Sequence, residues 1–162
     1  MRYWTATNLS ASSRTLREAV FRRMTSRGPL APMERGKLNV LLVEDRQDDA
    51  ALIRLVLEKG GYEITLTIAE TEGAYLSGLA TRPDIILSDY HLPAFSGERA
   101  LQLANELAPD LPFILLSGSI GKDTCAELIK RGANDCVLKD CLTRLPAAVE
   151  SAVAQRRLRN VN

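Results

Sequence analysis

The sequence has few of the side chains on which most metal and redox proteins depend. Its 162 residues include a single histidine, His91, and three cysteines, Cys125, Cys136 and Cys141. The cysteines show no CxxC spacing and have no cluster of histidines beside them, which excludes a zinc site built from these residues. We therefore interpret all three cysteines as free thiols in a reducing cytoplasm.

Long hydrophobic runs are also absent. No segment approaches the roughly 20 consecutive apolar residues that a membrane span needs. No apolar stretch follows the first basic residues either, which excludes a secretory signal. Residues 1–36 are rich in Ser, Thr and Arg. We interpret them as a basic, disordered extension outside the fold, with a functional basic arm and an organelle transit peptide as the alternatives.

Charge is distributed unevenly along the chain. Residues 1–37 carry eight Arg or Lys and two Glu, whereas the remaining residues carry thirteen basic and eighteen acidic side chains. An acidic body argues against nucleic acid as the main partner. The length fits one domain with an appendage, so residues 37–162 are expected to form a single domain.

This body alternates short apolar runs with segments of helical periodicity. The expected strands are Leu38–Val43, Tyr62–Ile68, Asp84–Ser88, Pro112–Leu116 and Asn134–Leu138. The expected helices are Gln47–Lys59, Glu70–Ala80, Gly97–Leu107, Lys122–Arg131 and a last helix from about Leu142 to Arg159. Because the strands are apolar runs separated by helices, the pattern predicts a parallel sheet covered on both faces.

Polar side chains follow four of these strands at the point where each strand ends. Glu44 and Asp45 follow the first strand, Asp89 the third, Ser117 the fourth and Lys139 the fifth. The carboxyl ends of parallel strands meet at one crevice, where carboxylates repel by about 1–4 kcal/mol per close pair. A divalent cation would remove that repulsion, and an all-oxygen ligand set suits Mg²⁺ rather than zinc. A hard cation beside an ammonium group predicts a phosphoryl site.

The helix after the first strand offers a simpler interpretation of some of these acids. Asp48 and Asp49 stand in its first turn, where negative side chains favour the positive end of a helix dipole. Glu44 and Asp45 alone would permit the same interpretation. The alignment of both with Asp89 and Lys139 favours a site instead.

Four segments carry a specific resemblance to a known family. VLLVEDRQDDA, DIILSDYHLPAFSG, PFILLSGSIG and DCVLKD resemble the receiver domain of response regulators, over about residues 38–158. The resemblance implies a flavodoxin-like (CheY-like) three-layer α/β/α sandwich. Its five-stranded parallel sheet would have the strand order 2-1-3-4-5, which is the order known for a chemotaxis member of this family.

By position, the resemblance also implies a role for each site residue. Asp89 matches the aspartate that takes a phosphoryl group from a phosphohistidine. Glu44 and Asp45 match the acidic pair that binds Mg²⁺, together with Asp89 and the backbone carbonyl of His91. The histidine side chain has no expected role.

Two further site residues and two departures complete the comparison with the family. Ser117 matches a hydroxyl that turns toward the phosphoryl group, and Lys139 matches the ammonium that binds it. Cys136 stands where many receivers have an aromatic ring that moves during signalling. Asp140 stands where many have a proline after the lysine, so we expect a trans peptide bond there. Both departures concern the output switch rather than phosphorylation.

The resulting prediction is a response regulator receiver, either a single-domain protein or one cut from a larger protein, that catalyses only its own phosphorylation and dephosphorylation. Its expected partners are a sensor histidine kinase or phosphotransfer protein and an unidentified downstream protein. The expected output face comprises Lys122–Arg131, the fifth strand and the last helix, with phosphorylation-dependent dimerisation left open. Neither nucleic acid nor membrane is expected to bind directly. The alternatives are a pseudo-receiver that binds proteins without phosphorylation, and an aspartate phosphatase. His91 disfavours the phosphatase, because such enzymes carry a second aspartate at that position.

Overall fold

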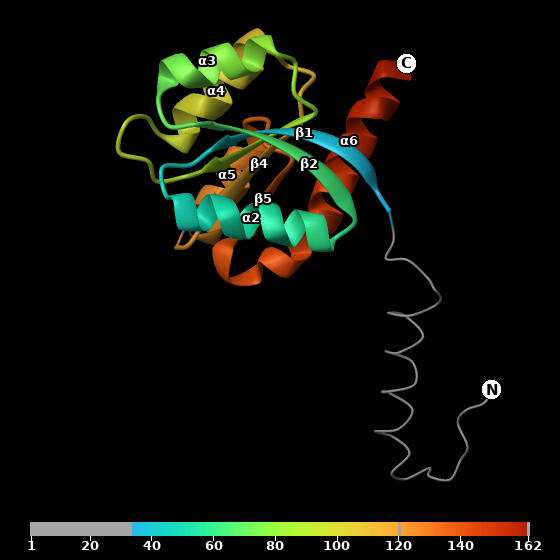
Figure 1. Cartoon of the computed structure of the whole chain (residues 1–162). Coiled ribbons are helices and arrows are strands. Elements are labelled where there is room, and N and C mark those ends of the chain that lie inside the picture. The colour runs from blue at the N-terminus through green and yellow to red at the C-terminus, as the bar shows by residue number, and fades with distance from the viewer. Residues whose placement is uncertain (1–33, 120, 162) are drawn as a thin grey trace, which may run out of the picture. The chain divides into compact units, whose positions relative to one another are not determined.

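The structure, a computed structural model, describes residues 34–119 and 121–161 (Figure 1). Five strands form one sheet in the order β2-β1-β3-β4-β5, and every neighbouring pair is parallel. The predicted fold class and strand order are therefore confirmed. The interpretation of the N-terminal extension falls almost entirely on residues 1–33, which lie outside the described residues.

All of the expected strands and helices are present, with small shifts at their ends. The strands are β1 Gly36–Val43, β2 Tyr62–Ala69, β3 Ile85–Asp89, β4 Phe113–Ser117 and β5 Asp135–Leu138. The helices are α2 Gln47–Lys59, α3 Glu72–Ala80, α4 Gly97–Leu107, α5 Lys122–Lys130 and α6 Leu145–Val161. Within the described ranges, no helix combines the length and the apolar composition that crossing a membrane requires.

The segment between β5 and α6 differs from the prediction. A 3-10 helix, η1 Lys139–Arg144, precedes α6, where the sequence predicted one continuous helix from about Leu142. Cys141 has φ −124° and ψ 41° inside this segment, which interrupts the helical backbone. The tighter turn follows β5 directly and places Lys139 at the carboxyl edge of the sheet.

Helices cover both faces of the sheet (Figure 1). On one face, Leu42 of β1 belongs to a buried cluster with Ile53 of α2 and Val149 of α6. On the other face, Leu41 belongs to a second cluster with Leu101 of α4 and with residues of α3 and α5. Each such buried aliphatic side chain contributes about 1.5–3 kcal/mol. The sheet is thus a rigid support for the polar residues at its edge.

Contacts with the domain begin slightly before β1. The Arg35 guanidinium donates a hydrogen bond of 2.8 Å to the backbone carbonyl of Gly60. It also lies 3.3 Å from a carboxylate oxygen of Glu150 and over the Tyr62 ring, 5.9 Å from its centre. Residue 35 therefore ties the start of β1 to both α2 and α6.

The start of α4 packs directly against the end of β3. Ser96 caps the helix by accepting a hydrogen bond of 3.1 Å from the backbone N–H of Arg99. The Gly97 N–H donates to the Tyr90 carbonyl at 3.1 Å. A Cβ atom at Gly97 would lie only 2.8 Å from the carbonyl oxygen of Asp89. Glycine is required here because the helix and the strand end approach so closely.

We expect Gly97→Ala to lower the free energy of unfolding by about 1–3 kcal/mol, because the new methyl group must push α4 away from β3. Urea denaturation measures this change. Gly73→Ala is the matched control in the first turn of α3, where an added Cβ meets nothing within 4 Å. That change should be neutral or stabilise by about 0.5–1 kcal/mol. Equal effects of the two variants would contradict the close-approach argument.

Candidate functional site

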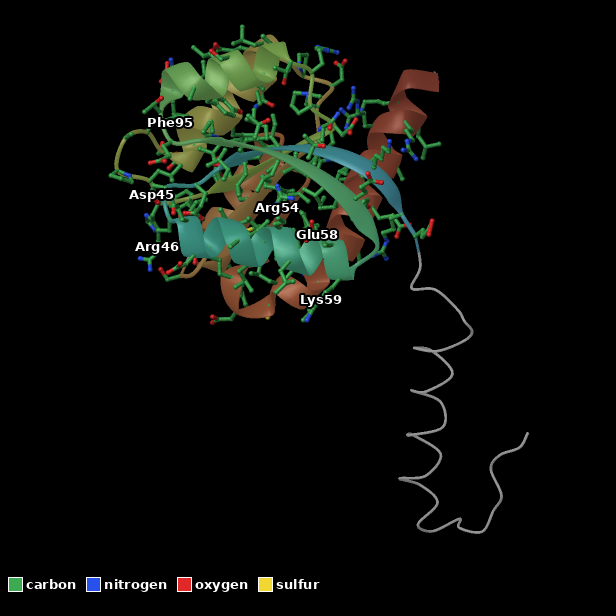
Figure 2. The ribbon with its side chains drawn as sticks, viewed as in Figure 1. Asp45, Arg46, Arg54, Glu58, Lys59 and Phe95 are labelled. Atoms are coloured by element: carbon green, nitrogen blue, oxygen red, sulfur yellow. A yellow bond between two sulfur atoms is a disulfide. The ribbon has the colours of Figure 1, made fainter. Side chains whose placement is uncertain are left out.

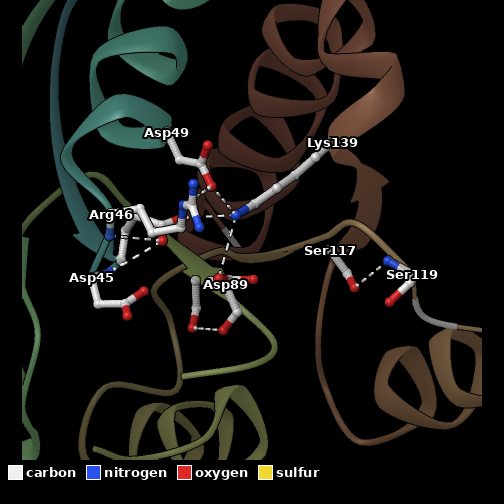
Figure 3. Close-up of polar contacts among 9 residues, drawn as sticks. Asp45, Arg46, Asp49, Asp89, Ser117, Ser119 and Lys139 are labelled. Carbon is white, nitrogen blue, oxygen red and sulfur yellow. Dashed lines mark hydrogen bonds and ion pairs between the residues drawn. The ribbon is translucent and has the colours of Figure 1, made fainter. Parts of the chain in front are cut away.

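The carboxyl edge of the sheet brings four of the predicted site residues together (Figure 3). Glu44 and Asp45 directly follow β1, Asp89 is the last residue of β3, and Lys139 directly follows β5. β1 and β3 are neighbours, whereas β4 separates β3 from β5. The long lysine side chain therefore spans the end of β4 to reach the carboxylates.

Three carboxylates at this edge form a compact acidic cluster. Glu44, Asp45 and Asp89 each offer one oxygen, and these oxygens all lie within 4.8 Å of one another. Glu44 is 1% exposed and Asp89 7%, whereas Asp45 is half-buried. Figure 2 shows Asp45 and Arg46 at one end of α2 and Lys59 at the other. The cluster is therefore open to solvent mainly at Asp45, and its all-oxygen donors fit Mg²⁺.

Burial and like charge act on the innermost carboxylate. Glu44 Oε1 accepts hydrogen bonds from the backbone N–H groups of Asp45, at 3.1 Å, and Arg46, at 3.2 Å. Burial raises the pKa of the Glu44 carboxyl; the hydrogen bond from Lys139 opposes this rise, and the charge of Asp89 adds to it. A second positive charge at the cluster would stabilise the ionised form, which is what a bound cation supplies.

Lys139 is the positive centre of the described site. Its Nζ donates hydrogen bonds to Asp49 Oδ2 at 2.7 Å and to Glu44 Oε2 at 3.0 Å, and lies 3.3 Å from Asp89 Oδ2. Burial acts to lower the pKa of Lys139. The hydrogen bonds with Asp49 and Glu44 and the charge of Asp89 outweigh this effect and raise the pKa well above its usual value. An ammonium has three N–H donors, one for each of these carboxylates.

Asp49 is a site residue that sequence reasoning missed. The pattern assigned it only to the first turn of a helix, together with Asp48. In the structure it is half-buried, while Asp48 is exposed, and it makes the shortest of the three contacts with Lys139. The available signal was position: α2 begins four residues after β1 ends, so its first turn faces the same edge of the sheet.

Ser117 and His91 lie differently from the carboxylates. Ser117 is fully buried at the end of β4, and its hydroxyl accepts a hydrogen bond of 3.3 Å from the Ser119 N–H (Figure 3). Among the described residues it has no hydrogen bond with Asp89 or Lys139. His91 is exposed, and its imidazole packs edge-on against the Tyr90 ring, with ring centres 4.7 Å apart. Its backbone carbonyl remains a predicted metal ligand.

The interpretation of the cysteines is wrong for two of the three. Cys125 of α5 and Cys136 of β5 form a disulfide, with Cα atoms 6.0 Å apart, whereas Cys141 is free and exposed. Their spacing of eleven residues matches no short motif, and only the packing of α5 beside β5 brings them together. Asp140 stands where many receivers have a proline after the lysine. No described peptide bond is cis, so the bond before Asp140 is trans, as expected.

A parallel sheet in this order, with an acidic cluster and a lysine at its carboxyl edge, defines the class of signalling receiver domains. Residues 40–150 match the response regulator receiver domain family. The chain therefore belongs to the response regulator receiver domain family of two-component systems.

Known relatives and solved structures agree with this assignment. The regulatory protein LuxO of Vibrio cholerae is 32% identical over 114 residues, which are 69% of this chain and 25% of LuxO. The phosphate regulon transcriptional regulatory protein PhoB of Pseudomonas aeruginosa is 34% identical over 119 residues, 72% of this chain and 52% of PhoB. The crystal structure of the signal receiver domain of a LuxO repressor protein from Vibrio parahaemolyticus has a TM-score of 0.68 and 28% identity, and the match covers 77% of this chain and 96% of that one.

The chain spans about a quarter to a half of the length of these curated relatives. What it shares with them is the receiver domain.

We expect Asp49→Asn to lower the pKa of Lys139, because it removes the charge of the nearest hydrogen-bond acceptor. An NMR titration of the lysine side-chain ¹³Cε signals measures this pKa. Asp48→Asn removes the same charge one residue away, from an exposed side chain, and should leave the Lys139 titration unchanged. An equal shift in both variants would mean that Asp49 acts only through long-range charge.

Proposed function

We propose that this receiver domain takes a phosphoryl group onto Asp89, with Mg²⁺ bound by Glu44, Asp45 and Asp89. The observation that carries the proposal is the contact of Lys139 with Glu44 and Asp89 beside the compact carboxylate cluster. Such a site combines an anionic nucleophile with positive charge on two sides. That combination suits the transfer of a phosphoryl group, whose oxygens are negatively charged.

The chemistry assigns a separate task to each side chain. A carboxylate oxygen of Asp89 attacks the phosphorus of a phosphohistidine, and the P–N bond breaks as the imidazole nitrogen keeps the electron pair. When bound, Mg²⁺ would supply charge that stabilises the transferring oxygens. Lys139 Nζ lies 3.3 Å from a carboxylate oxygen of Asp89. It is therefore close enough to donate one of its hydrogen bonds to an oxygen of a phosphoryl group on Asp89 instead. Ser117 would turn its hydroxyl from Ser119 toward the same group.

The proposed donor is a sensor histidine kinase or a phosphotransfer protein in the cytoplasm. Beyond its own phosphorylation and dephosphorylation, the domain would catalyse no reaction. Output would take place by protein contact at the surface of α5, β5 and α6. This surface offers apolar side chains to a partner, because Ile129 of α5 is 45% exposed and Leu138 of β5 42%, although α2 exposes Leu52 and Leu55 to a similar extent.

Labelling with acetyl phosphate and Mg²⁺ tests the phosphoacceptor. Intact-mass spectrometry should find one added phosphoryl group on the wild-type protein and none on Asp89→Asn, because an amide is not a nucleophile for this reaction. Asp48→Asn, at an exposed position, should label normally. Full labelling of Asp89→Asn would defeat the assignment, and an unlabelled wild-type protein would favour the pseudo-receiver.

Thermal unfolding with and without Mg²⁺ tests the metal ligands. Saturation at about 100 times the dissociation constant should stabilise the wild-type protein by about 2.7 kcal/mol, and a chelator should reverse the effect. Asp45→Ala should lose most of this stabilisation, because Asp45 is the carboxylate of the cluster that is most open to solvent. Asp48→Ala is the control and should keep it. An undiminished Mg²⁺ effect in Asp45→Ala would show that another group binds the ion.

A further inference from the structure

The disulfide between Cys125 and Cys136 joins the first helical turns of α5 to β5. β5 is an edge strand of the sheet, and both cysteines are half-buried rather than enclosed in the core. A bridge at the edge of a sheet, with partly exposed partners, is accessible to dissolved thiols. In its exposure it differs from the structural disulfides of small secreted domains, which are buried and resist reduction.

The bridge also lies between two segments that carry site residues. Cys136 pairs with Leu115 in the sheet register, and two residues further on Leu138 pairs with Ser117. Lys139 follows Leu138 directly, and the loop after Ser117 leads into α5. The disulfide thus connects the strand that ends at the phosphoryl-binding lysine to the helix that follows the phosphoryl-sensing hydroxyl.

Among the described residues, the buried side chain of α5 and the polar contacts next to it lie toward the C-terminal end of the helix. Leu128 is the buried residue of this helix, and Gly121, at the N-cap position just before it, provides no side-chain cap. Just past its C-terminus, Arg131 contacts Glu98 of α4 at 3.1 Å, and its carbonyl accepts a hydrogen bond of 2.6 Å from the Asn105 amide. Among the described residues, the disulfide at Cys125 is the one covalent cross-link between the N-terminal half of α5 and the sheet.

We propose that Cys125 and Cys136 are a redox-active pair whose disulfide fastens the N-terminal half of α5 to β5, and whose reduction by a small thiol releases it. The oxidised and reduced domains would then present different α5–β5 surfaces to a partner. The inference about output rests on the proposed function, since it takes these elements as the output surface. The redox chemistry itself does not depend on phosphorylation.

The exchange follows ordinary thiol–disulfide chemistry. A thiolate, such as that of glutathione, attacks one sulfur of the pair, the S–S bond breaks, and a mixed disulfide forms. A second thiolate displaces the protein sulfur, so that two external thiols become one disulfide while Cys125 and Cys136 gain two electrons and two protons. Oxidised glutathione drives the reverse reaction.

The disulfide should affect how phosphorylation changes the α5–β5 surface, because Cys136 of β5 is bonded to Cys125 of α5. With the bond in place, motion of the loop after Ser117 toward a phosphoryl group cannot carry the N-terminal half of α5 along. With the bond reduced, that half is held only by its weaker contacts and is free to follow the loop. We therefore expect phosphorylation to reach the α5–β5 surface in the reduced domain and to remain near the metal site in the oxidised one.

Alkylation of the full chain tests the redox pair. After equilibration with oxidised glutathione, mass spectrometry should find Cys125 and Cys136 joined in one bridge, and Cys141 either alkylated or in a mixed disulfide with glutathione; after equilibration with excess reduced glutathione it should find three alkylated cysteines, in line with one bridge and one free thiol. Cys141→Ser should keep the bridge, whereas Cys125→Ser should leave Cys136 alkylated after reduced glutathione and in a mixed disulfide with glutathione after oxidised glutathione. Three alkylated cysteines under oxidising conditions, or a bridge that resists reduced glutathione, would overturn the proposal.

NMR spectra with beryllofluoride, a phosphoryl mimic, and Mg²⁺ test the coupling. Amide shifts should extend through residues 118–131 in the reduced protein and in Cys125→Ser, but stay near the carboxylate cluster in the oxidised protein. Identical shifts in both redox states would defeat the coupling and leave the phosphorylation proposal intact. No shifts in either state would instead defeat the phosphorylation proposal. The alkylation experiment on Asp89→Asn should give the wild-type result, because the redox chemistry does not depend on phosphorylation. This variant therefore separates the redox proposal from the phosphorylation proposal.

Discussion

The contact of one ammonium group with three carboxylates is the interaction on which the site depends. Lys139 meets Glu44, Asp49 and Asp89 within 3.3 Å, and these acids come from the end of β1, the start of α2 and the end of β3. Without this charge, the carboxylates would repel one another by about 1–4 kcal/mol per close pair. One lysine neutralises only part of the negative charge, which leaves the cluster suited to a cation.

Close packing behind the site holds these charges in position. The last four residues of β1 are buried and apolar, and in β3 three buried aliphatic residues precede the buried Ser88 and Asp89, so Glu44 and Asp89 mark the polar edge of the sheet. Gly97 allows α4 to approach the carbonyl of Asp89 too closely for any side chain. A carboxylate on such a rigid support loses little entropy when it binds a ligand, which is the advantage of a preorganised site.

The departure at Cys136 has a physical consequence. Where many receivers have a ring that can move, this chain has a thiol that reaches a second thiol on α5. A ring couples strand and helix by filling space, whereas a covalent bond couples them by fixing a distance. In the proposed redox switch, this position would act on the surface of α5 and β5 through a covalent bond rather than through packing.

The sequence by itself determined the strands, the helices and the acidic edge, because apolar runs, helical periodicity and four motifs each depend on local pattern. The strand order followed only from the resemblance to receiver domains that these motifs carry. Glu44, Asp45, Asp89 and Lys139 could be placed together since the carboxyl ends of parallel strands must meet. Asp49 could not be distinguished from Asp48, because only the orientation of α2 turns one of them toward Lys139. Likewise, no spacing rule pairs Cys125 with Cys136: a bridge needs two Cα atoms within about 4.4–6.8 Å, and the packing of α5 beside β5 decides that distance.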